Sequence, residues 1–179
     1  MEDSLPQHSL TDGVVVLRPL ATNDALAWLA GEDEEQRRWF EASRPSQLPD
    51  VEKFIADCQE SWRTMGSHRH WGIWSRGPEV LVGGIDLRAL GSDEVNLSYL
   101  VFPEKRRRGF ALRAAQLALG YASTSMSAKA AIIKMLPGNE KSRNLALALG
   151  ARYVDDEPSD GGATFHVFRL MLHDTPGGE

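Results

Sequence analysis

The hydrophobic pattern of this chain changes its period near the middle, and this change constrains the fold more than any other feature. Three strand-like runs, at 70–74, 80–87 and 95–102, are separated by short segments rich in turn-forming residues. Connections this short join antiparallel neighbours, because parallel strands need a long crossover. The middle of the chain therefore predicts a three-stranded antiparallel meander.

The second half of the chain alternates between the two periods. A stretch rich in alanine and leucine at 110–121 predicts a helix, and the stretch at 140–149 predicts another that ends at Gly150. Apolar runs predict three further strands at 130–136, 152–154 and 164–172. The order strand, helix, strand, helix follows the meander, and the last two strands can pair around a glycine-rich turn.

The first 62 residues add one strand and three helical segments. A β-branched run at 14–17 predicts the strand, and the stretches at 25–29 and 34–40 predict short helices. A longer amphipathic helix is predicted where apolar residues recur at spacings of three and four, at Val51, Phe54, Ile55, Cys58 and Trp62. The fold class is therefore α+β (mixed α/β), with a largely antiparallel sheet of about six or seven strands and helices on its faces.

Size and composition favour one domain. The 179 residues suffice for one self-supporting core, which we place at residues 11–172 with flexible ends at 1–10 and 173–179. A single cysteine, Cys58, excludes a disulfide scaffold and favours a reducing compartment. No run approaches the roughly 20 apolar residues that cross a bilayer. We expect a cytoplasmic protein with no membrane partner, and the net charge of −5 argues against nucleic acid as a partner.

One basic segment departs from the acidic balance of the chain. Lys105 to Arg108 lie between a predicted strand and the helix that begins near Phe110, and Gly109 lies at the junction. The first amides of a helix have no intrahelical acceptor, so such a junction can bind an anion. A basic run is also typical of a solvated turn. The glycine motifs of dinucleotide-binding folds and nucleoside triphosphatases are absent, which leaves the pattern Arg-x-x-Gly-x-Ala at 106–111.

Further residues accompany this pattern at characteristic spacings along the chain: Tyr99, the pair Pro103-Glu104, Asn139-x-x-Ser142 and Leu149-Gly150. With these residues the sequence, from about 14 to 172, resembles the GNAT superfamily of acyl-CoA N-acyltransferases. Within that superfamily it resembles the branch that contains ribosomal-protein N-terminal acetyltransferases. The resemblance implies a GNAT-like fold in which the fourth and fifth strands splay apart around the coenzyme.

The resemblance also implies a set of coenzyme contacts. Acetyl-CoA would be the co-substrate, without a metal, and the backbone of Leu100 and Val101 would bind its pantetheine arm. The diphosphate would lie on the loop made by Arg106, Arg107, Arg108, Gly109, Phe110 and Ala111. Asn139 and Ser142 would approach the pantetheine from the other side, although an asparagine that simply caps the next helix fits the same pattern.

The sequence offers more than one candidate for each catalytic group. Many GNAT enzymes protonate the departing thiolate with a tyrosine whose place is taken here by Ala146, so Ser142 is the first candidate and Tyr153 the second. The branch often carries a glutamate where this chain has Asn96. Glu94 is therefore a candidate base, acting through water.

Asp86, on the preceding strand, is an equal candidate for that base. Both carboxylates are equally typical of exposed strand residues. A further alternative needs no strong base, because a protein α-amine has a reference pKa near 8 against about 10.4 for lysine.

The expected partner is an amine acceptor, with a protein or peptide α-amine favoured. A small-molecule amine and a non-catalytic acyl-CoA sensor remain as alternatives, and the protein is expected to be a monomer or homodimer. His68 and His70 lie two residues apart, but no further residues with metal-ligand spacing accompany them. The acidic run 32–35 is interpreted as a helix start that the helix dipole favours.

Overall fold

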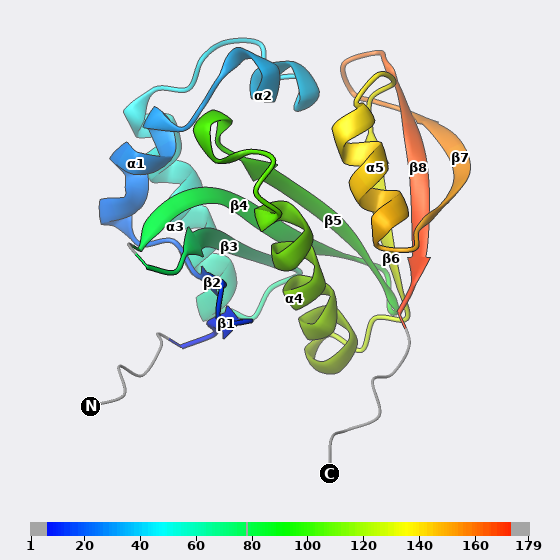
Figure 1. The fold of residues 1–179 in the computed structure, drawn as a ribbon, viewed down its shortest axis with the longest axis horizontal. Helices are drawn as coiled ribbons and strands as arrows, with labels where there is room; N and C mark the ends of the chain where they lie inside the picture. The colour runs from blue at the N-terminus through cyan, green and yellow to red at the C-terminus, as the bar shows by residue number, and fades with distance from the viewer. Residues whose placement is uncertain (1–6, 78, 173–179) are drawn as a thin grey trace.

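The computed structural model describes residues 7–77 and 79–172, and Figure 1 shows their arrangement. The strands are β1 (Leu10–Thr11), β2 (Val15–Arg18), β3 (His68–Ser75), β4 (Val80–Leu90), β5 (Glu94–Val101), β6 (Ala130–Met135), β7 (Arg152–Pro158) and β8 (Thr164–Met171). The helices are α1 (Ala25–Ala30), α2 (Glu34–Trp39), α3 (Leu48–Arg63), α4 (Phe110–Ser125) and α5 (Glu140–Ala148). None of these helices is long and apolar enough to cross a membrane.

All eight strands form one sheet in the order β1-β2-β3-β4-β5-β6-β8-β7. Every neighbouring pair is antiparallel except β5 and β6, which are parallel and joined through α4. The mixed α/β class and the antiparallel meander are therefore confirmed, while the predicted strand count of six or seven is one short. The extra strand is β1, whose two residues are too few to show any hydrophobic period.

The parallel pair separates soon after it begins. Only three residues of each strand are paired, from Glu94 opposite Ala130 to Asn96 opposite Ile132. Beyond that point β5 continues to Val101 beside β4, and β6 continues to Met135 beside β8. The sheet therefore splays between β5 and β6, as the resemblance implied, and the facing backbone edges of both strands lack a strand partner there.

Helices cover both faces of the sheet, and two apolar clusters form the core. On one face, small residues of α4 such as Ala114 and Ala118 lie in a cluster with Leu87 and Leu97. On the other face, residues of α1 and α3, among them Trp28 and Ile55, form the second cluster with Phe102, which follows β5. In Figure 1, α4 lies in front of the sheet and α3 behind it, while α5 lies near β6 and β8.

Two residues before the predicted start of the domain at residue 11 contact the rest of the structure. Leu10 belongs to β1, and the backbone carbonyl of His8 accepts a hydrogen bond from the indole of Trp71. The rest of the predicted flexible ends, residues 1–6 and 173–179, lies outside the described residues.

Candidate active site

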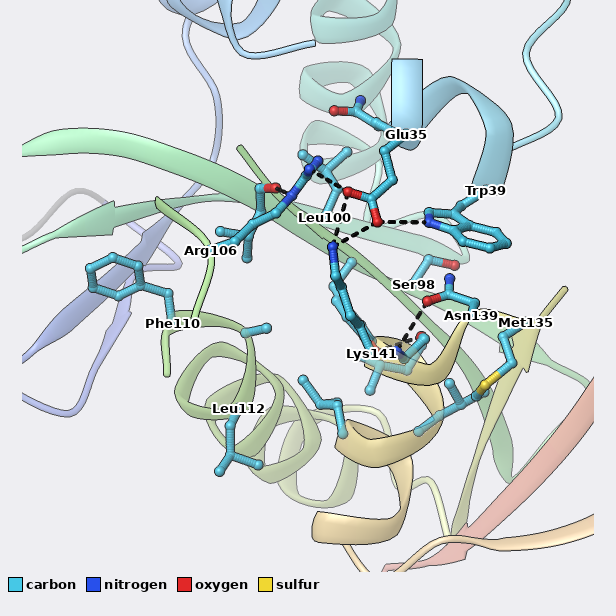
Figure 2. Close-up of a pocket in the computed structure, with 18 of the residues that line it drawn as sticks. Glu35, Trp39, Ser98, Leu100, Arg106, Phe110, Leu112, Met135, Asn139 and Lys141 are labelled. Carbon is cyan, nitrogen blue, oxygen red and sulfur yellow. Dashed lines mark hydrogen bonds and ion pairs between the residues drawn. The ribbon is translucent and has the colours of Figure 1, made fainter. Parts of the chain in front are cut away.

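A cavity of about 350 Å³ opens where β5 and β6 diverge. Its walls come from the second half of β5, the end of β6, the loop before α4, the first turn of α4, the start of α5, and α2 (Figure 2). These segments lie far apart in the sequence and meet only because the sheet splays.

The backbone of β5 offers hydrogen-bonding groups to this gap. The carbonyl of Leu100 points toward β4, because a Cβ placed on Gly83 would lie 2.2 Å from that oxygen. Amide and carbonyl groups of successive strand residues point to alternate sides, so Tyr99 and Val101 face the gap. Of the two residues expected to bind the pantetheine, Val101 has its backbone toward the gap and Leu100 has its backbone toward β4. Both residues line the cavity.

The loop before α4 has the geometry of an anion site. Arg107 and Gly109 both have positive φ, +62° and +78°, and α4 begins at Phe110 immediately afterwards. A Cβ placed on Gly109 would meet no atom within 4 Å, so the space beside this glycine is open to a ligand. Arg107, Gly109, Phe110 and Ala111 line the cavity, whereas Arg108 is exposed and is not among the lining residues.

Arg106 has a different role from the one its charge suggests. Its guanidinium donates to both carboxylate oxygens of Asp33, at 2.7 and 2.9 Å, and to Glu35 at 2.7 Å. Its Nε donates to the carbonyl of Val101 at 2.9 Å. The hydrogen bond from Arg106 lowers the pKa of Asp33, which stays ionised. Arg106 therefore fixes α2 and the end of β5 to the loop before α4. The two carboxylates already compensate its positive charge.

The acidic run 32–35 begins α2, as predicted. Asp33 accepts a hydrogen bond from the amide of Gln36 and so caps the helix. Glu35 joins three elements, because it also accepts from Lys141 of α5 at 2.7 and 3.0 Å and from the indole of Trp39 at 3.4 Å. Figure 2 shows these contacts at the mouth of the cavity. No sequence pattern links residues 35, 39 and 141, so sequence reasoning missed this group.

Asn139 and Ser142 lie at the start of α5. The side-chain oxygen of Asn139 accepts from the amide of Ser142 at 3.1 Å, so the capping interpretation is confirmed. The hydroxyl of Ser142 lies 2.6 Å from the hydroxyl of Tyr99, and all three residues line the cavity. Burial raises the pKa of Tyr99 to about 12, so its phenol remains protonated at neutral pH.

The structure does not bring the other predicted catalytic residues into the cavity. Glu94 lies at the paired end of β5, where its carboxylate binds Arg169 at 2.6 and 3.0 Å. Tyr153 lies on the edge strand β7, with 54% of its surface exposed, and packs against Phe168. The alternation of side chains along a strand predicts which residues share a face with Asn96. It does not predict at which end of β5 the sheet opens, because that depends on where β5 pairs with β6.

The charge of the cavity wall favours an anionic ligand. Among the described residues that line it, five are basic and one, Glu35, is acidic; the basic ones are Lys105, Arg106, Arg107, Lys134 and Lys141. No cluster of three or more potential metal ligands was found within residues 7–77 and 79–172. The wall therefore fits a polyanion held by amides and cations.

The sheet splays between its two parallel strands, and a loop that leads into a helix lies at the opening, as the resemblance to the GNAT superfamily implied. The family model described as "Acetyltransferase (GNAT) domain" matches residues 15–152, which is well over half of the chain. The protein therefore belongs to the GNAT family and is an acyl-CoA-dependent N-acetyltransferase. A search of curated protein sequences found no match.

Solved structures agree in fold. RimJ of Mycobacterium smegmatis, solved in complex with CoA-disulfide, has a TM-score of 0.77 at 20% identity, over 92% of this chain and 85% of that one. The ribosomal-protein-S5-alanine acetyltransferase of Vibrio fischeri has a TM-score of 0.74 at 14% identity, over 93% and 97%. The microcin C7 self-immunity acetyltransferase MccE, solved with acetyl-CoA and AMP, has a TM-score of 0.76 at 15% identity, over 92% and 99%.

Proposed function

We propose that this acetyltransferase moves the acetyl group of acetyl-CoA directly to the α-amine of a protein or peptide. The observation that carries the proposal is the hydroxyl pair of Tyr99 and Ser142 in a cavity with no uncommitted carboxylate among its described lining residues. Such a cavity can supply a proton to a leaving group, and it suits an amine that needs little help to lose one.

Coenzyme binding follows from the shape of the opening. The gap-facing backbone groups of Tyr99 and the amide of Val101 would pair with the pantetheine arm as a neighbouring strand would, while the carbonyl of Val101 accepts from Arg106. The first amides of α4 and the side chain of Arg107 would hold the diphosphate, where the helix dipole favours negative charge. Arg106 would act indirectly, by fixing the loop in place through Asp33 and Glu35.

Proton supply follows from the hydroxyl pair. When the amine attacks the thioester carbonyl, the carbon–sulfur bond breaks and a thiolate leaves. Ser142 would donate its proton toward the sulfur, while Tyr99 donates to the serine oxygen across their 2.6 Å contact. Because burial keeps Tyr99 protonated, the pair always holds a proton for this step.

The acceptor preference follows from the carboxylates. The hydrogen bond from Lys141 lowers the pKa of Glu35, and the nearby charge of Arg106 lowers it further. Glu35 is therefore a poor proton acceptor. A site without a strong base favours amines that are partly neutral already. At neutral pH the neutral fraction of an α-amine exceeds that of a lysine side chain by a few hundred-fold, given reference pKa values of about 8 and 10.4. The name of the Vibrio fischeri enzyme, a ribosomal-protein-S5-alanine acetyltransferase, describes a protein acceptor and so supports this preference.

A small-molecule amine is the second candidate. The structural similarity to MccE, whose name describes self-immunity to microcin C7, is the observation that favours it. The lysine-rich mouth formed by Lys105 and Lys141 would suit an acceptor that carries a phosphate.

Two measurements test the proposal. Calorimetric titration should show acetyl-CoA binding, and an assay of released thiol should show turnover on peptides with free N-termini but not on the same peptides with blocked N-termini and an internal lysine. Turnover on small amines alone would select the second candidate. Absence of binding at millimolar acetyl-CoA would rule out both.

A further inference from the structure

Polar side chains from three strands share one face of the sheet beside the cavity. Asp86 of β4 lies opposite Ser98 of β5 on one side and opposite His70 of β3 on the other. Residues in register share a face, and neighbouring strands lie about 4.8 Å apart. Ser98 lines the cavity (Figure 2), so Asp86 lies one strand away from the cavity wall.

Asp86 has a histidine partner. The Nε2 atom of His68 lies 3.1 Å from a carboxylate oxygen of Asp86. Both side chains remain partly open to solvent, with 25% and 22% of their surfaces exposed. When Nε2 donates to Asp86, the Nδ1 atom of His68 is left to take up a further proton, and no partner for it is found among the described residues. A proton accepted at Nδ1 would leave the ring positively charged beside the carboxylate of Asp86.

The other groups around this pair are fixed in one protonation state. His70 is 5% exposed, and burial lowers its pKa to about 4, so it stays neutral. Cys58 of α3 is buried, which raises its pKa to about 12. Arg88 lies opposite His68 in register, and Asp57 of α3 lies close enough to Cys58 to affect its pKa. The pair His68–Asp86 therefore remains as the group on this face that joins an available ring nitrogen to a carboxylate.

Ser98 connects this face to the cavity. Its hydroxyl oxygen accepts a hydrogen bond from the side-chain amide of Asn96 at 3.0 Å, so its own hydrogen is free to point elsewhere. Asp86 makes no direct hydrogen bond to Ser98, and a water molecule fits the chemistry of a gap between a hydroxyl and a carboxylate. Asn96, at the position where the resemblance placed a glutamate, would orient this route and would not itself accept the proton.

We infer that the pair His68–Asp86 receives the proton that the acceptor amine loses, through water held beside Ser98. This inference rests on the proposed function. The amine nitrogen bonds to the acetyl carbon, and the bond from that carbon to sulfur breaks. The nitrogen's proton passes through water to the pair, which later returns it to solvent. The sulfur takes a proton from Ser142, and the Tyr99–Ser142 pair then regains a proton from solvent, so one proton leaves the amine and one reaches the coenzyme.

The test is a comparison of pH profiles. His68→Gln and Asp86→Asn keep similar size and remove the proton-accepting function. The matched control is His166→Gln, because His166 also pairs with a carboxylate, Asp156, at 2.7 Å, but on the exposed hairpin of β7 and β8. For His68→Gln we expect kcat at pH 7 to fall roughly 10- to 100-fold, with an unchanged Kd for acetyl-CoA and recovery near pH 9, where the amine is neutral.

The outcomes separate this inference from the proposed function. Wild-type pH profiles in both variants of the pair would overturn the inference and leave the proposed function intact. No transfer by the wild-type protein to any amine would overturn both. Thermal unfolding checks that the variants are folded; if Asp86→Asn unfolds, the more exposed His68→Gln decides alone. His166→Gln should behave as the wild type, and a loss of activity there as large as in His68→Gln would also count against the inference.

Discussion

The hydroxyl groups of Tyr99 and Ser142 lie 2.6 Å apart, although 43 positions separate the two residues in the sequence. Tyr99 comes from the strand edge that faces the gap, and Ser142 comes from the first turn of α5, which Asn139 caps. The contact therefore joins the two walls between which the coenzyme would lie.

This contact predicts that the two hydroxyls act as a unit. Ser142→Ala and Tyr99→Phe should each lower kcat by roughly 10- to 100-fold, because each interrupts proton supply to the thiolate. The double variant should lose less than the product of the two single effects, since both changes remove one pathway. Steady-state kinetics measures this, and calorimetry should show that the Kd for acetyl-CoA changes little.

The control for this pair is Tyr153→Phe. Tyr153 was the second candidate from the sequence, but it is exposed on β7 outside the cavity, so we expect wild-type kinetics. A rate loss at Tyr153 equal to that at Tyr99 would contradict the assignment.

The carboxylates that hold Arg106 predict an effect on coenzyme affinity. Arg106→Gln should raise the Kd for acetyl-CoA roughly tenfold, because the loop loses its links to Asp33, Glu35 and the carbonyl of Val101. The free energy of unfolding should fall by on the order of 1 kcal/mol, as expected for a partly exposed ion pair. Arg108→Gln is the matched control and should alter neither quantity, because Arg108 is exposed and does not line the cavity.

The same ion pair predicts a dependence of stability on pH. The hydrogen bond from Arg106 lowers the pKa of Asp33 below its ordinary value of 3.8. A carboxylate with a lowered pKa in the folded state stabilises the fold fully above its unfolded value, and this contribution is lost as pH falls through the folded value. Urea unfolding should therefore show a larger effect of Arg106→Gln at pH 7 than at pH 3. An equal effect at both values would mean that the pair adds no charge-dependent stability.

Two glycines predict opposite outcomes for the same substitution. Gly83→Ala should lower the free energy of unfolding by about 1–3 kcal/mol, because the new Cβ would lie 2.2 Å from the carbonyl oxygen of Leu100. It should also weaken acetyl-CoA binding, since β5 must move. Gly120→Ala, in the middle of α4 with no atom within 4 Å of the new Cβ, should stabilise the protein by up to about 1 kcal/mol. Chemical denaturation measures the free energy of unfolding of both variants. Destabilisation by Gly120→Ala would contradict the prediction that α4 has room for a methyl group at this position.

Sequence alone determined the features that depend on local chemistry. Hydrophobic period predicted the meander and α4 and α5 to within a few residues, because a strand or helix that buries one face must repeat its apolar residues at a fixed spacing. The strand-to-helix junction at 106–111 and the cap at Asn139 are likewise local, and the structure places most of the junction, together with Asn139, at the cavity.

Tertiary structure alone decided which of these residues meet. The carboxylate partners of Arg106, Asp33 and Glu35, lie more than 70 positions away in the sequence. The charge of Arg106 therefore suggested a phosphate ligand, whereas the fold pairs it with carboxylates. Leu100 and Tyr99 are adjacent in sequence, yet only the pairing of β5 with β4 determined that the backbone of Tyr99 faces the gap. Glu94 lies on the predicted strand but at its closed end, because the sheet opens only after Asn96. Strand pairing and register are set by contacts between distant segments, which no local pattern encodes.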